Sequence, residues 1–383
     1  SCDKDAILIT HGDNDTFPLW YAQEVESIRT DIRIMNTSLL GMDWYIDQMK
    51  NQVYDSKPLQ ISLPRADYLY GTNDWVEVVD AVNRPILASE AMDIFKNPKY
   101  RRGRTGMIAS KHIRVPVNKE NAVKYGIVKE KDADRMVDYL DINLKVDRLQ
   151  KFDLIILDIL SNYQWDRPIY FVSQYADGDL GLGKYLQCEG FAYKVTPILA
   201  NTEEGELPID SEKVYDLLMT KLDFDGNADT TVLVDYQNLY TFVAVNPLRS
   251  LFVEEALKLK DEGKADKAEK ILDRCYEVTP KANYPYCISL LSSANEYSIV
   301  QSIDLYLDFG KMEKAKALAE GFLEDAIPSA LYFGQIVGGE MLNKDVVTRD
   351  MQCVYMISQL FEEKNEKEYA EFILTRLQSA LTN

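Results

Sequence analysis

The order of apolar runs in residues 6–50 constrains the fold of this chain more than any other feature. The short run AILIT is typical of a buried strand. FPLWYAQEVESI, with Pro18 in its first turn, is typical of an amphipathic helix. A second strand, IRIMNTSLL, and a second helix, MDWYIDQMK, follow. Strand, helix and strand at this spacing predict parallel strands joined by a right-handed crossover. We therefore expect residues 1–245 to form an α/β domain around a largely parallel, Rossmann-like sheet.

Two later segments complete the prediction for this domain. The segment KDADRMVDYLDINL reads as a helix. The segment KFDLIILDILSNYQWDRPIYFV reads as a helix, then a turn at Trp-Asp-Arg-Pro, then a short strand.

The pattern changes after residue 245, where strand-like runs stop and long amphipathic helices take over. Three segments align, namely DEGKADKAEKIL, DFGKMEKAKALA and EEKNEKEYAEFI. Each has a turn residue followed five positions later by an alanine: Gly263 with Ala268, Gly310 with Ala315, and Asn365 with Ala370. This pattern predicts helical hairpins and resembles the tetratricopeptide repeat. The copies are spaced by 47 and 55 residues, whereas that repeat is about 34 residues long. We expect residues 246–383 to form a tetratricopeptide-like α-helical hairpin array with enlarged loops.

Composition excludes several classes of function. The net charge is −19, so the surface repels phosphate backbones and anionic lipid headgroups, which argues against nucleic-acid binding. The chain has only two histidines, and its five cysteines form no CxxC pair, so we expect no metal site built on these residues. No apolar run is long enough to span a bilayer. The first strand begins almost at once, without an initiator methionine, so we expect the chain to be part of a longer protein.

The stretch HGDNDT, which follows the first predicted strand, is the main candidate site. Asp13, Asn14, Asp15 and Thr16 lie where a strand ends and a helix begins, which is the edge where open α/β sheets bind ligands. These side chains could bind a cation or the hydroxyls of a sugar. They could equally serve as a helix cap and a turn. Both interpretations stay open, and we expect one aspartate to act as a cap while the other faces a pocket.

Two further motifs are candidates for ligand binding. YRRGRTG places Arg101, Arg102 and Arg104 around two glycines, so it could hold a phosphate or a carboxylate, or it could be a solvated loop paired with nearby acids. Trp165 in NYQWDRP could stack on a sugar, although a tryptophan before a proline-led strand more often fills a core. No catalytic triad can be nominated, so the catalytic residues stay unknown.

Four blocks of the sequence carry a resemblance to a known family. They are ILITHGDNDTFPLWYAQEVESIRTDIRIMNTSLLGMDWYIDQMK, IRVPV with GIVKEKDADRMV, LDILSNYQWDRPIYF, and YLQCEGFAYKVTPI. Together they resemble the C-terminal soluble region of a family of large bacterial membrane proteins, common in Bacteroidetes and once classed as a domain of unknown function. That family is grouped with protein O-mannosyltransferase-like enzymes of the GT-C type.

The resemblance implies a role within a larger protein. The parent would be a multi-pass glycosyltransferase whose membrane half binds a polyprenyl-phosphate sugar donor. This chain would lie on the periplasmic side of the inner membrane, as an accessory or recognition region that contacts its own membrane-embedded catalytic half and an acceptor protein or glycan. It would need no cofactor and would not be catalytic alone. Two alternatives stay open: a separate metal-assisted carbohydrate-active enzyme in the α/β domain, and a scaffold that binds partners through its helical repeats.

Overall fold

The computed structural model describes residues 1–82, 84–103, 105–173, 180–200, 208–234, 246–287, 294–335 and 340–382. The chain divides into two compact units, residues 1–210 and 211–383. From the sequence, we expected the boundary after residue 245. The described residues from 211 to 234 pack with the helices that follow, since α6 (Ser211–Asp216) contacts α9 (Asn246–Asp261) and α7 (Asp225–Ala228) contacts α10 (Ala265–Val278).

The first unit contains a five-stranded sheet in the order β10-β11-β9-β1-β2. Its strands are β1 (Ile7–Thr10), β2 (Arg33–Asn36), β9 (Ile169–Phe171), β10 (Leu186–Cys188) and β11 (Tyr193–Val195). β1 pairs in parallel with both β2 and β9, and helix α1 (Asp13–Glu24) connects β1 to β2. The predicted parallel strand–helix–strand arrangement is therefore confirmed at the start of the chain. β2 lies at the end of this sheet, and no strand among the described residues pairs with its outer edge.

Two smaller sheets complete the first unit, in the orders β5-β3-β8 and β4-β6-β7. Their strands are β3 (Trp75–Val78), β4 (Ile86–Leu87), β5 (Met107–Ile108), β6 (His112–Pro116), β7 (Tyr139–Asn143) and β8 (Arg148–Gln150). All three sheets are mixed, because the pairs β3–β8, β6–β7, β9–β11 and β10–β11 are antiparallel. The unit is thus a mixed α/β structure with several small sheets. One largely parallel sheet was expected, but among the described strands only β1 with β2 and β9, β3 with β5, and β4 with β6 pair in parallel.

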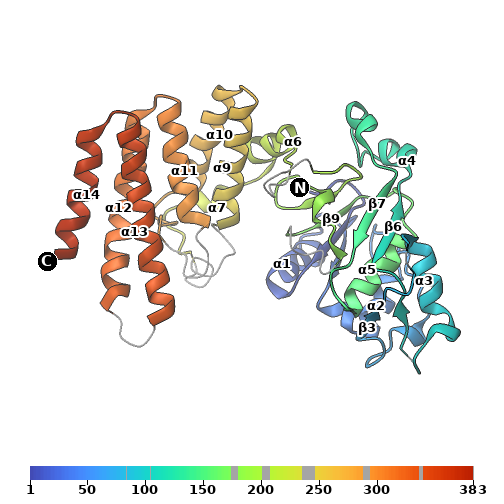
Figure 1. The fold of residues 1–383 in the computed structure, drawn as a ribbon. Helices are drawn as coiled ribbons and strands as arrows, with labels where there is room; N and C mark the ends of the chain where they lie inside the picture. Colours follow the sequence, from blue (N-terminus) through green and yellow to red (C-terminus); the bar gives the residue numbers. More distant parts are fainter. Residues whose placement is uncertain are drawn as a thin grey trace. The chain divides into compact units, whose positions relative to one another are not determined.

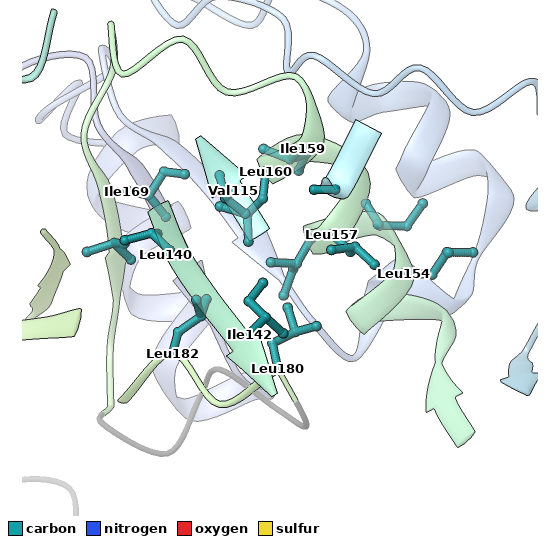
Figure 2. Close-up of a cluster of buried hydrophobic side chains, with 14 of the residues drawn as sticks. Val115, Leu140, Ile142, Leu154, Leu157, Ile159, Leu160, Ile169, Leu180 and Leu182 are labelled. Atoms are coloured by element: carbon teal, nitrogen blue, oxygen red, sulfur yellow. The ribbon is translucent and has the colours of Figure 1, made fainter. Parts of the chain in front are cut away.

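The helix α5 (Lys151–Ser161) lies at the centre of the core of the first unit. Its start is fixed by a capping box in which the backbone N–H of Gln150 donates to Asp153 at 3.0 Å. Figure 2 shows Leu154, Leu157 and Leu160 of this helix close to side chains of β6, β7 and β9. The predicted helix, turn and strand of KFDLIILDILSNYQWDRPIYFV are confirmed by α5 and β9.

Other helices and turns of the first unit are short. They are α2 (Asp43–Met49), α3 (Ala88–Lys96) and α4 (Lys119–Lys124), with 3₁₀ turns at Leu39–Gly41, Arg65–Asp67, Pro98–Tyr100, Glu130–Arg135 and Gly183–Tyr185. The helix predicted for KDADRMVDYLDINL is wrong, because this segment ends in strand β7. Leu140 and Ile142 are buried and their neighbours are not, as an antiparallel pairing with β6 requires.

The described part of the second unit is helical (Figure 1). After α6, a π-helical turn (Leu217–Lys221) and α7, the helices are α9, α10, α11 (Ala294–Asp308), α12 (Met312–Gln335), α13 (Glu340–Glu363) and α14 (Lys367–Thr382). α9 packs on α10 and α11, α12 packs on α11 and α13, and α13 packs on α14. In the described residues, no helix combines the length and the apolar character that crossing a bilayer requires.

The three predicted hairpin turns are confirmed. Gly263, Gly310 and Asn365 have φ angles of 74°, 69° and 66°, in the left-handed region. The backbone N–H of the residue after each turn residue closes the helix end in the same way. Lys264 donates to the carbonyl of Leu259, Lys311 donates to the carbonyl of Tyr306, and Glu366 donates to the carbonyl of Phe361. This pattern defines a Schellman motif, in which the positive φ satisfies the last carbonyl groups.

The alanines at the hairpin contacts are also buried as predicted. Ala268 and Ala315 have no exposed surface, and Ala370 is 5% exposed. Small residues at these positions allow the paired helices to approach closely. The helical hairpins are thus established, whereas the likeness to the tetratricopeptide repeat stays a prediction.

Candidate functional site

The HGDNDT stretch forms the junction between β1 and α1. Gly12 has a φ of 81°, and the helix begins directly after it, at Asp13. The buried hydroxyl of Thr16 donates to the carbonyl of Gly12 at 2.7 Å, and it lies 2.7 Å from the hydroxyl of Thr10 at the end of β1. Thr16 therefore ties the first turn of the helix to the strand before it.

The side chain of Asn36, at the end of β2, joins the same network. Its amide nitrogen donates to the hydroxyl of Thr16 at 2.9 Å and to the carbonyl of Gly12 at 3.1 Å. Its amide oxygen accepts from the backbone N–H of Ser38 at 2.8 Å. Asn36 is 1% exposed. The side-chain amide of Asn36 and the hydroxyl of Thr16 are thus both bonded within the protein, and they hold the carboxyl ends of β1 and β2 together.

The carboxylates of the stretch do not share one position. Asp13 and Asn14 are exposed, while Asp15 is half-buried and accepts the backbone N–H of His11 at 3.3 Å. Because Asp13 and Asp15 are two residues apart in a helix, their side chains do not face each other. Asp13 has no protein partner within the described part of the chain. Asp15 thus binds the backbone N–H of the residue before the N-cap, Gly12, and no side chain caps the N–H groups of the helix itself. Asp13 is exposed and lines neither of the two pockets described below.

The helix starts earlier than predicted. We expected it to begin near Phe17, but Asp13 and Asp15 already lie in its first turn. The helix dipole favours the earlier start, because the carboxylates of Asp13 and Asp15 are stabilised at its positive end. Across the described residues, no group of three or more His, Cys, Asp or Glu side chains is arranged to hold a metal ion.

The arginine loop is engaged by acids of the same unit. Arg101 makes a bidentate pair with the buried carboxylate of Asp67, with N–O distances of 2.6 and 2.7 Å. The hydrogen bond to Asp67 raises the pKa of Arg101. Arg102 pairs with Glu77 at 3.0 Å on the surface, and Arg104 lies outside the described residues. Arg101 therefore stabilises the fold and is not available to a ligand.

The second glycine of this loop is required by packing. A Cβ atom at Gly106 would lie 2.4 Å from the ring of Phe95. The backbone N–H of Gly106 donates to Asn73 at 3.0 Å, and Asn73 in turn donates to the carbonyl of Asp67 at 2.8 Å. Gly106, which resembled part of an anion-binding loop, is thus required because the backbone passes close to the ring of Phe95.

A shallow hollow lies beside this loop on the face of the β5-β3-β8 sheet. Trp75, Glu77, Arg102 and Arg148 line it, and its volume is about 210 Å³. Small-molecule sites usually measure about 300–1,000 Å³. The hollow is therefore too small to be the main binding site of the unit.

Trp165 belongs to the core. Its side chain has no exposed surface, and its indole N–H donates to the carbonyl of Pro116 at 2.8 Å. The ring of Tyr163 lies 4.8 Å from its ring, centroid to centroid. This burial fits a core plug and leaves no face of the indole for a sugar.

A larger pocket, of about 370 Å³, lies between α1, β2 and α2. We call it the α1–α2 pocket. Trp20, Arg33, Trp44 and Tyr54 are among its lining residues, and none of them was nominated from the sequence. A signal was present, since WY pairs occur in both predicted helices that flank the second strand. Only the packing of the two helices beside β2 brings these aromatic residues together.

Comparison with known proteins gives one match. Residues 1–214 match the family model described as TMEM260-associated domain 2, which covers more than half of the chain. No curated protein and no solved structure is significantly similar to the chain.

Proposed function

Because the chain belongs to the TMEM260-associated domain 2 family, we propose that it is the extracytoplasmic accessory region of a glycosyltransferase-like membrane protein. In this role it recognises the acceptor, a protein or a glycan, and does not transfer sugar by itself. The membrane half of the parent binds the polyprenyl-phosphate sugar donor and supplies the catalytic residues. The accessory region lies on the periplasmic side of the inner membrane and contacts that half.

The observation that carries this proposal is the extent of the family match. It covers residues 1–214 and thus includes the whole first unit, with the β1–α1 junction and the α1–α2 pocket. The pocket supports a recognition role because its size falls in the range of small-molecule sites and its walls are rich in aromatic residues.

The geometry gives less support to a separate metal-assisted enzyme. Such an enzyme would need Asp13 and Asp15 in one set of ligands. Asp15 is bound to the backbone of His11, and the two carboxylates leave the helix in different directions. In the same way, the arginine loop does not offer an anion site through Arg101, which is paired with Asp67.

An activity assay tests the proposal in two parts. The purified chain, incubated with polyprenyl-linked sugar and acceptor, should give no glycosylated product, because the catalytic groups lie elsewhere in the parent. The full-length parent should modify the acceptor, and a parent without this region should show a raised KM for the acceptor with the donor KM unchanged. Turnover by the chain alone, or an unchanged acceptor KM in the shortened parent, would contradict the accessory role.

A further inference from the structure

The α1–α2 pocket has aromatic walls from three separate segments. Trp20 comes from α1, Trp44 from α2, and Tyr54 from the turn that follows α2. Trp44 and Tyr54 are 55% and 50% exposed, which is unusual for rings of this size. Trp20 is half-buried and stacks on Phe17 at 5.5 Å. Broad aromatic faces at an open pocket provide surfaces for the C–H faces of a pyranose ring.

Polar side chains at the same pocket can form further hydrogen bonds. Gln23 uses its amide nitrogen for the carbonyls of Arg29 and Ile32, at 2.8 and 2.9 Å, which leaves its amide oxygen as an acceptor. Glu24 accepts the hydroxyl of Tyr54 through one oxygen. Gln48 is exposed and has no partner among the residues that the structure describes. Amides and carboxylates are suited to hydroxyl groups, which both donate and accept.

The base of the pocket includes a buried arginine with one unused nitrogen. Arg33 is 3% exposed. Its Nη2 donates to the carbonyls of Asn51, Ser56 and Lys57 at 2.8, 3.0 and 3.1 Å, and its Nε donates to the hydroxyl of Ser56 at 3.2 Å. Its Nη1 is buried and has no hydrogen-bond partner. A buried donor without an acceptor is costly, so a ligand oxygen would stabilise Nη1 once the side chains that cover this atom move aside.

Tyr54 at the pocket wall, and Ser27 and Arg29 in the segment between α1 and β2, adopt an unusual backbone conformation. Ser27, Arg29 and Tyr54 have φ angles of 54°, 51° and 50°, although none of them is a glycine. The amide of Gln23 holds the carbonyl of Arg29, and the hydroxyl of Thr30 donates to Asp55 at 2.8 Å. A positive φ is strained for a residue with a side chain, but Asp5, Asn73, Trp165 and Asn365 also have one away from the pocket, so this conformation does not mark the pocket.

The charges at the pocket favour a neutral ligand. Arg33 brings one positive charge at the base, and Glu24 brings one negative charge at the pocket wall. No second cation lines the pocket in the described residues. The protein as a whole carries a net charge of −19, which disfavours the approach of an anion.

From these observations we infer that the α1–α2 pocket binds one neutral pyranose ring of a glycan. Trp44 and Trp20 contact the ring faces, Gln48, Gln23 and Glu24 bind its hydroxyls, and Arg33 donates to a ring substituent oxygen. This inference adds a ligand class and a binding site to the proposed function. It rests on that function in one respect, namely that the bound glycan is part of the acceptor.

Tryptophan N–H signals in an NMR titration test the inference. The chain has four tryptophans, Trp20, Trp44, Trp75 and Trp165, so four indole signals can be assigned by substitution. The probes are the methyl pyranosides of glucose, galactose, mannose and N-acetylglucosamine. Each is added up to about 50 mM, well above the millimolar range of weak binding. At least one probe should shift the signals of Trp20 and Trp44 in a saturable way, while Trp75 and Trp165 stay unchanged.

Substitutions provide the matched controls. Trp44→Ala should weaken binding by at least ~10-fold, whereas Trp75→Ala should not change it, since Trp75 is exposed to a similar extent, 57%, on another sheet. Gln48→Ala alters an exposed side chain, so it should weaken binding and leave the melting temperature unchanged. The Gln48→Ala variant therefore still tests the inference if the Trp44→Ala variant unfolds.

Three results would overturn the inference. They are no saturable shift with any probe, equal shifts at all four tryptophans, or binding that Trp44→Ala and Gln48→Ala both leave intact. A synthetic Ser/Thr-rich peptide without sugar serves as the competing ligand. If it shifts Trp44 and the glycosides do not, the pocket recognises a peptide, and the pyranose assignment is wrong. In that case the accessory role, which is tested by the acceptor KM of the parent, still stands.

Discussion

At the scale of single residues, a threonine and an asparagine hold the β1–α1 junction. Thr16 and Asn36 are buried and bind each other at 2.9 Å. We expect Thr16→Val to lower the free energy of unfolding by about 1–3 kcal/mol, because the buried hydroxyl of Thr10 and the buried amide of Asn36 each lose a hydrogen bond. Urea denaturation measures the change. The control is Asp13→Ala, which removes an exposed side chain and should cost less than about 1 kcal/mol. Equal losses in the two variants would show that the buried network is unimportant.

A second residue-scale prediction concerns Asp31. The guanidinium of Arg29 binds both of its oxygens, at 2.8 and 2.9 Å, and the backbone N–H of Asp5 donates to it at 2.8 Å. The hydrogen bonds from Arg29 lower the pKa of Asp31. A lowered pKa means that the charged form stabilises the folded state above the unfolded pKa of about 3.9, and that this stability is lost as the pH falls through the folded pKa.

Asp31→Asn should therefore lower the free energy of unfolding at pH ~7 by about 1 kcal/mol. The difference between the variant and the unmodified protein should shrink as the pH falls below about 4. Urea denaturation at several pH values measures it. A difference that does not depend on pH would contradict the role of the charge.

At the scale of elements, the helical hairpins depend on residues that adopt a positive φ. A Cβ atom at Gly263 would meet no atom within 4 Å, so only the backbone conformation opposes a side chain there. We expect Gly263→Ala to lower the free energy of unfolding by about 1–2 kcal/mol. Gly226 in α7 is the matched control, because it is equally free of neighbours and has no positive φ. Gly226→Ala should be neutral or stabilising, and a similar loss at both sites would rule out the conformational cause.

At the scale of the whole molecule, the chain consists of two units with separate cores. Residues 1–210 contain the sheets and α5, and residues 211–383 contain the helical hairpins. A compact unit with its own core can fold independently. We expect each segment, expressed alone, to show a cooperative thermal transition by circular dichroism. A segment that is unfolded by itself would show that the two units depend on each other.

The sequence alone was sufficient for features that depend on near neighbours. Gly263, Gly310 and Asn365 marked the hairpin turns, because a left-handed residue and the helix end that it closes lie within a few positions. The crossover from β1 through α1 to β2 was likewise readable, because apolar spacing over a few turns sets helix or strand.

Tertiary structure decided the features that join distant residues. β7 was taken for a helix although Tyr139–Asn143 alternates buried and exposed positions, because pairing with β6 outweighs local preference. Arg101 has a structural role because it pairs with Asp67, which lies 34 positions away in the sequence. The aromatic residues that line the α1–α2 pocket come from separate elements. No local sequence pattern indicates which faces of these elements pack together. Such contacts depend on how whole elements pack, and so the site could be located only once the fold was known.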